Sequence, residues 1–312
     1  MFLKIFSGYC LLKNKKLQGE IVMEIRNTNN VIISCCLSGA GTSRAKAPAV
    51  PIHPHEIAAD VVKVVKAGAA IVHIHVRNDD ETKSMSLDKF TEAIELTREA
   101  CKKEDLDVII NLTTSGGSYI DEERIQHLEK LRPEMCSFDA GTLNWANSFV
   151  FENHPRLLEK LSKAVLEYDV KPEVEVFDTG FMGNTAYYIK KHGLKVPTHY
   201  QFIMNVPGGM PGTVKNLAFL VEMLPEGSTW SVSGIGSAHM PMMLAALAMG
   251  ADGIRVGLED NIIYDVDKDG KKIIGTNEQF VKRAVDLCMI AGRGVATAAE
   301  ARKLLGIARK CL

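Results

Sequence analysis

Strand-like and helix-like segments alternate along this chain with a regularity that leaves few folds open. Runs of β-branched and apolar residues, which are typical of buried strands, recur at 31–37, 70–76, 106–112, 135–138, 172–177, 198–205, 229–233 and 253–257. Segments with helical periodicity follow them at 56–66, 87–102, 121–131, 155–168, 184–191, 214–223, 241–249 and 277–291. Eight βα units over roughly 250 residues predict a single-domain α/β fold, the (β/α)8 TIM barrel. A doubly wound open sheet is the alternative.

The two ends of the chain lie outside this alternation. Residues 1–29 precede the first strand, and their apolar and lysine residues lack the order of a targeting signal. Met23 stands just before the first strand-like segment, so we expect residues 1–29 to be an N-terminal extension with the natural start at Met23. Residues 30–312 are then the catalytic barrel domain, which ends in an amphipathic helix over 297–312.

Composition narrows the class of protein. The 312 residues carry a formal net charge of −1, which argues against broad binding to nucleic acid or to an anionic membrane. No apolar run reaches the roughly 18 residues that span a bilayer. The seven cysteines are scattered without paired spacing, as is typical of reduced thiols. We therefore expect a cytoplasmic protein with small-molecule partners.

Polar residues collect at the carboxyl ends of the predicted strands, where barrel enzymes carry their active sites. These strand-end residues are His73, His75 and Arg77; Asn111, Thr113, Thr114, Ser115, Gly116 and Gly117; Ser137 and Asp139; Glu173, Glu175 and Asp178; Asn205; Ser231 and Ser233; Arg255, Glu259 and Asp260. The pattern predicts that the active site lies at this end of the barrel.

The second predicted strand carries a His-x-His pair. Side chains alternate along a strand, so His73 and His75 point the same way. Glu259, at the end of the eighth strand, can cross the barrel mouth and join them. Two imidazoles and one carboxylate with an open position are typical of a catalytic zinc site. The alternative for the pair is that both rings only hydrogen-bond inside the core.

Other strand-end residues suggest further roles. Asp260 follows Glu259 and points in a different direction, which makes it a candidate general base. Arg255 is expected to orient these carboxylates or to bind a substrate carboxylate. The loop 113–117 has small hydroxyl and glycine residues whose backbone N–H groups can approach an anion, so it is a candidate substrate-binding loop. The loop 233–237 is interpreted either as a phosphate site or as a tight turn.

Two further motifs are interpreted as structural. His53 and His55 also form a His-x-His pair, but Pro54 between them favours the start of a helix. Trp145 and Trp230 are expected to be packing residues.

An ordered set of motifs resembles the β-keto acid cleavage enzymes, whose prototype acts on 3-keto-5-aminohexanoate. The similarity runs from about residue 30 to about residue 305. Its motifs are Gly39-Ala40, Ala49-Val50-Pro51, Lys66-Ala67-Gly68-Ala69, His73-Ile74-His75-Val76-Arg77, Pro133-Glu134-Met135, Gly141-Thr142-Leu143-Asn144, Lys171-Pro172-Glu173-Val174-Glu175-Val176-Phe177-Asp178, Pro225-Glu226-Gly227-Ser228-Thr229-Trp230 and Arg255-Val256-Gly257-Leu258-Glu259-Asp260-Asn261.

The resemblance implies a zinc-dependent barrel enzyme, usually a homotetramer. Such an enzyme condenses a β-keto acid with acetyl-CoA and cleaves the adduct to acetoacetate and a new acyl-CoA. By matching position, the resemblance implies three sets of residues: the Zn2+ ligands His73, His75 and Glu259; the base Asp260 with its neighbour Arg255; and the polar residues Thr113, Ser137 and Glu175 around the substrate.

Two positions depart from the prototype. Gly41 stands where the prototype has an acidic residue placed to meet a substrate ammonium group, and Thr113-Thr114-Ser115 stands where it has serine before Thr-Gly-Gly. The first departure predicts an uncharged or differently polar side chain on the β-keto acid. The second keeps a hydroxyl, so the chemistry is expected to be retained. A zinc-dependent hydrolase on the same barrel is the alternative function, and a requirement for a CoA thioester separates the two.

Overall fold

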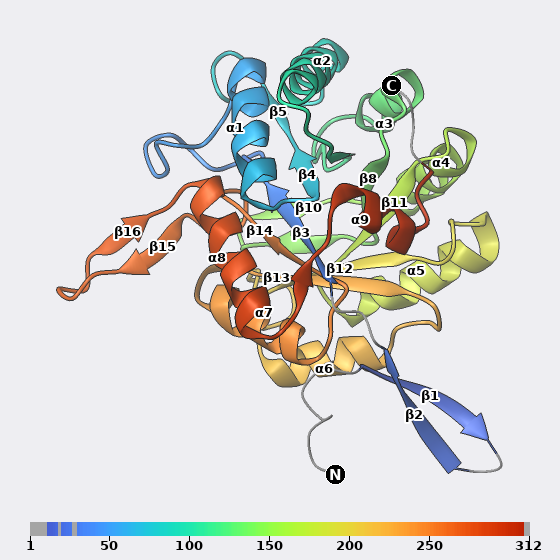
Figure 1. Cartoon of the computed structure of the whole chain (residues 1–312). Coiled ribbons are helices and arrows are strands. Elements are labelled where there is room, and N and C mark those ends of the chain that lie inside the picture. The colour runs from blue at the N-terminus through green and yellow to red at the C-terminus, as the bar shows by residue number, and fades with distance from the viewer. Residues whose placement is uncertain (1–10, 18–19, 27–29, 309–312) are drawn as a thin grey trace.

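The computed structural model describes residues 11–17, 20–26 and 30–308, and it confirms the predicted barrel (Figure 1). Parallel strands are hydrogen-bonded in a ring, and the last of them pairs with the first. In ring order the strands are β3 (Asn30–Cys36), β4 (Ile71–Ile74), β7 (Ile109–Leu112), β8 (Met135–Asp139), β11 (Lys171–Val176), β12 (His199–Met204), β13 (Thr229–Gly234) and β14 (Gly253–Val256).

Helices surround this ring and bury one face each against it. On α4, for example, Leu157, Leu158, Leu161 and Val165 are buried at helical spacing. The helices are α1 (Pro54–Ala67), α2 (Leu87–Lys103), α3 (Asp121–Leu131), α4 (Pro155–Glu167), α5 (Thr179–His192), α6 (Val214–Glu222), α7 (His239–Ala248), α8 (Asn277–Ile290) and α9 (Ala298–Leu305). The main apolar core lies between strands and helices.

The side chains inside the barrel change from apolar at one end to polar at the other. Every second residue of a strand points inward. At the amino-terminal end the inward residues are apolar and pack with α9; they include Ile32, Ile71, Ile109 and Met135. Two residues further along the same strands stand Ser34, His73, Asn111 and Ser137, all buried. Polar side chains therefore gather at the carboxyl end, as the sequence predicts.

The boundary of the second barrel strand differs from its prediction. The expected strand 70–76 is interrupted at His75, because β5 (Val76–Arg77) leaves the barrel and pairs antiparallel with β6 (Lys83–Ser84). Sequence periodicity cannot show this, since the apolar run continues across the break.

Some helix boundaries differ as well. The helix expected from residue 184 begins at Thr179, because the Asp178 side chain accepts a hydrogen bond from Gly180 N at 2.7 Å and caps it. The terminal helix predicted over 297–312 ends at Leu305, before Gly306 with φ +67°. Residues 309–312 lie outside the described residues.

Short strands outside the ring were not predicted. β9 (Leu143–Trp145) and β10 (Phe149–Phe151) form a hairpin, and so do β15 (Ile263–Val266) and β16 (Lys272–Ile274), which project from the barrel (Figure 1). β17 (Gly294–Val295) pairs with β3.

In the expected extension, β1 (Leu11–Leu17) pairs with β2 (Glu20–Arg26), and residues 1–10, 18–19 and 27–29 lie outside the described residues. The natural start at Met23 stays a prediction. Among the described helices none is both long and apolar enough to cross a membrane. Among the described residues, the cysteines at positions 35, 36, 101 and 288 are free thiols.

Candidate active site

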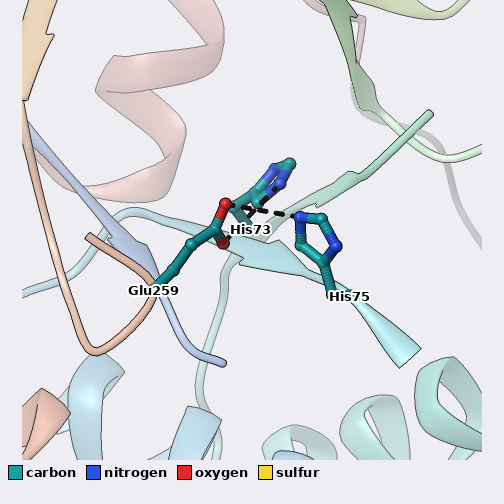
Figure 2. A group of neighbouring side chains, drawn as sticks. All are labelled: His73, His75 and Glu259. Carbon is teal, nitrogen blue, oxygen red and sulfur yellow. Dashed lines mark ion pairs between the residues drawn. The ribbon is translucent and has the colours of Figure 1, made fainter. Parts of the chain in front are cut away.

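His73, His75 and Glu259 meet at the carboxyl end of the barrel, and Figure 2 shows both rings facing the carboxylate. Their potential ligand atoms all lie within 4.8 Å of one another. His75 Nε2 is 3.3 Å from Glu259 Oε1, and His73 Nε2 is 4.0 Å from Glu259 Oε2. His73 lies on β4, whereas Glu259 follows β14, with β3 between these strands. The predicted meeting of the three side chains is therefore present.

The chemistry of these donors fits a divalent cation. Glu259 Oε2 is buried and has no hydrogen-bond partner among the described residues. Burial lowers the pKa of His73 to about 3, so the ring is neutral and can offer a lone pair. Burial acts to raise the pKa of Glu259, but His75, Arg255 and His73 outweigh it and hold that pKa below its usual range. An ionised carboxylate and imidazole lone pairs are the ligands that zinc prefers.

The loop after β3 fixes the position of Glu259. A Cβ on Gly39 would lie 2.7 Å from Glu259 Cγ, and Gly39 has φ +58°, so only glycine fits here. Arg77, 3% exposed, holds this loop by donating to the carbonyl oxygens of Ser38 at 2.7 Å, Gly39 at 2.8 Å and Thr42 at 2.7 Å. Arg77 therefore supports the loop that positions Glu259.

Asp260, the expected base, is held by three hydrogen bonds. Arg255 donates from Nε to Oδ2 and from Nη2 to Oδ1, both at 3.0 Å, and Ser233 Oγ donates to Oδ2 at 2.6 Å. A carboxylate has about four lone-pair positions. One position on Oδ1 therefore remains for a proton, so Asp260 is oriented by its partners and still able to act as a base.

Arg255 joins this carboxylate to two others. Its guanidinium also donates to Glu175 Oε1 at 2.7 Å and to Glu259 Oε1 at 3.0 Å. Burial acts against the charge of Arg255, but the surrounding carboxylates, Asp260 first among them, raise its pKa well above the usual value. Burial also raises the pKa of Glu175, although Arg255 opposes this.

A cavity of about 510 Å³ opens beside these residues. Its ionisable lining residues are His75, Glu175, Arg255, Glu259, Asp260, Asp139 and Lys83. Its aromatic lining comes from Trp145, Phe149, Phe151 and Phe177, so Trp145 has a place in the cavity as well as in packing. Trp230, at 3% exposed, is a core residue as expected. The cavity falls within the usual 300–1,000 Å³ range of ligand sites.

The expected substrate-binding loop after β7 contributes two of its residues, Ser115 and Gly117, to the cavity. Thr114 N donates to Ser137 Oγ at 2.9 Å, and the next two N–H groups donate to Thr113 Oγ1 and to Thr114 O. These three N–H groups are engaged within the protein and are not available to an anion in this structure. Thr113 and Ser137 are fully buried.

Two glycines of the predicted loops contact side chains, one by packing and one through its N–H group. A Cβ on Gly116 would lie 2.5 Å from Arg124 Cγ. Gly236, in the loop 233–237, donates its N–H to Asn261 Oδ1 at 2.6 Å, so a phosphate cannot use that group as it stands. His53 is the N-cap of α1 with Pro54 at the first helical position, which confirms its structural interpretation.

Among the charged residues of the cavity, sequence reasoning gave no role to Asp139 and Lys83. Asp139, 2% exposed, accepts a hydrogen bond from Ser115 Oγ at 2.6 Å. Its position at a strand end was the available signal. Lys83 lies on β6, and within the described part of the chain its Nζ has no carboxylate within 4.0 Å. No sequence signal marks Lys83, because β6 reaches the cavity only through its pairing with β5.

The chain matches the family model for β-keto acid cleavage enzymes over residues 30–307. It belongs to this family. The 3-keto-5-aminohexanoate cleavage enzyme of Fusobacterium nucleatum is 38% identical over 279 residues, which cover 89% of this chain and 98% of that protein. The 3-oxoadipate:acetyl-CoA acetyltransferase of Cupriavidus necator is 34% identical over 283 residues, covering 90% of this chain and 96% of that protein.

A solved structure has the same fold as this protein. The apo structure of ObcA superposes with a TM-score of 0.72 at 23% identity, over 83% of this chain and 66% of ObcA. The family membership confirms the resemblance of the motifs. The protein is therefore an enzyme of acyl transfer and carbon–carbon bond cleavage.

Proposed function

We propose that this enzyme holds zinc between His73, His75 and Glu259, condenses a β-keto acid with acetyl-CoA, and cleaves the adduct to acetoacetate and a new acyl-CoA. The observation that carries the proposal is the meeting of this ligand set and the oriented Asp260 at one cavity. Membership of the family supports the same reaction class.

Bound there, the metal supplies Lewis acidity that makes the C2 protons of the β-keto acid easier to remove. Asp260 accepts one of these protons on Oδ1, and the electrons of the C–H bond form an enolate. The enolate carbon attacks the thioester carbonyl of acetyl-CoA, which forms a carbon–carbon bond and expels CoA thiolate. Arg255 keeps the Asp260 carboxylate in one orientation during this transfer.

The second half of the reaction returns the proton. CoA thiolate attacks the former keto carbon, and the bond between that carbon and C2 breaks with its electrons moving to C2. Protonated Asp260 gives its proton to C2. The products are acetoacetate, built from C1 and C2 of the β-keto acid and the acetyl group, and an acyl-CoA that carries the remainder of the β-keto acid.

The cavity supports a β-keto acid without an ammonium group near Gly41. Apart from its chain neighbours, no atom of the described residues lies within 4 Å of a Cβ built on Gly41, and Gly41 itself carries no acidic group. Lys83 adds a cation to the lining. The names of the relatives include an aminated and a dicarboxylic keto acid, so the family admits different side chains.

We also propose that the enzyme works in the cytoplasm as a homo-oligomer, most simply a tetramer. The free cysteines support a reducing compartment. The β15–β16 hairpin supports association, because an isolated hairpin is marginally stable in water and this one exposes Ile263, Val266, Ile273 and Ile274. Sedimentation of the purified protein tests the oligomer.

A substrate panel tests the reaction. Purified enzyme is incubated with acetyl-CoA and a set of β-keto acids with neutral, acidic and aminated side chains, and the acyl-CoA products are identified by mass. The proposal expects a new acyl-CoA that matches one β-keto acid, together with acetoacetate. Consumption of a β-keto acid without CoA would instead support a hydrolase.

A further inference from the structure

His73 has a buried side that faces away from Glu259. The ring is 1% exposed, and its Nε2 is the nitrogen directed to Glu259 (Figure 2). Asn111 lies directly opposite His73 in the β4–β7 ladder. His73 Nδ1 and Asn111 Oδ1 are both buried, and neither has a hydrogen-bond partner at normal bonding geometry among the described residues, so each is open to the other. Asn111 also acts to raise the pKa of the His73 ring, as a nearby accepting oxygen does.

The orientation of the Asn111 amide is set from its other side. Asn111 Nδ2 donates to Glu173 Oε2 at 2.7 Å, and both residues are 0% exposed. Because the amide nitrogen faces Glu173, the amide oxygen faces His73. An oxygen can only accept, so His73 carries its proton on Nδ1 and keeps the Nε2 lone pair for the cation site.

Glu173 is itself held within a buried polar layer. His199 Nε2 lies 4.0 Å from Glu173 Oε1, and His199 also contacts Ser231 Oγ at 3.2 Å and Thr229 Oγ1 at 2.9 Å. Burying polar groups costs free energy unless they are fully paired. These buried polar side chains end at His73, a proposed metal ligand. Their benefit would then lie in metal binding rather than in folding stability.

We propose that Asn111 and Glu173 are positioning residues that fix the tautomer of His73 in which Nε2 is free to bind the metal. Partners of this kind on a ligand histidine typically change metal affinity by about 10- to 100-fold. The inference rests on the proposed function, because it requires the metal. Asn111 and Glu173 neither line the cavity nor belong to the proposed ligand set.

Two substitutions test it. Asn111→Leu removes the acceptor for His73 at similar volume. Glu173→Gln keeps the shape but replaces the carboxylate that accepts from Asn111 Nδ2 with an amide that can either accept from Nδ2 or donate to Oδ1. The Asn111 amide is then no longer held in one orientation, and neither is the proton of the His73 ring. Ser231→Ala is the matched control, because Ser231 belongs to the same buried layer and contacts His199 but not Asn111.

The readouts are zinc affinity by chelator competition, the absorption spectrum of the cobalt-substituted protein, and thermal unfolding of the metal-free protein. We expect zinc affinity to fall at least about tenfold in Asn111→Leu and Glu173→Gln, with a changed cobalt spectrum, while Ser231→Ala stays within about twofold of the parent. If Asn111→Leu does not fold, Glu173→Gln decides alone.

The outcomes separate this inference from the proposed function. Parent protein that binds zinc, with variants that bind it equally well, overturns the positioning role and leaves the function standing. Equal weakening in Ser231→Ala also overturns it, because the effect would then belong to the buried layer in general. Parent protein that binds no zinc removes the metal from the proposed function, and the inference falls with it.

Discussion

The carboxylate of Asp260 is bonded through both oxygens, so its side chain cannot rotate without breaking contacts with Arg255 and Ser233. Orientation of this kind is what a general base needs, because proton transfer depends on distance and direction before it depends on pKa. The same contacts explain how Asp260 and Glu259, adjacent in sequence, take different tasks. Glu259 turns toward the histidines, and Asp260 turns toward Ser233.

Replacing Asp260 with Asn should separate chemistry from metal binding. The amide keeps the size of the side chain but cannot take the C2 proton, so we expect turnover to fall about 10²- to 10⁴-fold with zinc content unchanged. Steady-state kinetics and metal analysis of the same preparation check this. Ser233→Ala is the control, since it removes one bond to Oδ2 and keeps the base. Undiminished turnover in Asp260→Asn would exclude Asp260 as the base.

Gly41 offers a test of substrate choice at a single position. A side chain fits there, because no atom of the described residues apart from its chain neighbours lies within 4 Å of a built Cβ and φ is outside the left-handed region. Gly41→Glu should raise kcat/KM for an aminated β-keto acid relative to a neutral one by about tenfold, the worth of one charged hydrogen bond. Gly41→Gln controls for size. If the Gln variant shifts the preference as much as the Glu variant, charge at this position does not select the substrate.

Among the elements, the β9–β10 hairpin brings aromatic side chains to the cavity. Phe149 is 54% exposed yet lines the cavity, so a ligand can bury more of it. Phe149→Ala should raise KM several-fold with little change in kcat, whereas Val150→Ala, 60% exposed and outside the lining, should change neither. Steady-state kinetics of both variants checks this. Equal effects of the two substitutions would mean that the hairpin acts only through its fold.

The elements also show where the sequence was a sufficient guide. Buried parallel strands are apolar runs whatever their neighbours, so the strand run at 253–257 predicted β14 closely. The His73 and His75 pair could be placed because side-chain direction follows from strand geometry. β9 and β10 could not be placed, because pairing of three-residue strands depends on where the chain returns, and Phe149 reads as an ordinary loop residue.

The candidate site also has features that the sequence could predict and features that it could not. The residue types at strand ends predicted His73, Glu259 and Asp260, because their chemistry is visible in the side chain itself. The hydrogen bonds of the loop after β7 could not be predicted, since Ser137 reaches Thr114 only when β7 and β8 are adjacent. The sequence predicted that Arg255 orients Asp260. It could not predict that Arg255 donates to both carboxylate oxygens.

For the molecule as a whole, buried neutral histidines make stability depend on pH. Burial lowers the pKa of His73, His127 and His199 to about 3 and that of His239 to about 4. In the unfolded chain the usual value is about 6.5. Between these values the unfolded state binds protons that the folded state does not, so stability is full above pH 6.5 and is lost as the pH falls.

The contribution of one histidine can be measured in metal-free protein. His199→Gln removes a single titrating group, so its free energy of unfolding should fall less between pH 7 and pH 5 than that of the parent, by about 2 kcal/mol. Burial raises the pKa of Glu173 to about 7, which opposes the trend in both proteins and cancels in the comparison. Urea unfolding at the two pH values checks this, and identical pH dependence would show that His199 is not neutral when folded.

The central claim, that a β-keto acid and acetyl-CoA exchange carbon at this site, is tested most directly with doubly ¹³C-labelled acetyl-CoA. The proposed bond changes place both acetyl carbons in acetoacetate and leave the new acyl-CoA unlabelled, because its acyl group comes from the β-keto acid. Mass spectrometry of the two products should find this distribution. Acetoacetate without heavy carbon, or breakdown of the β-keto acid with acetyl-CoA left intact, would contradict the account.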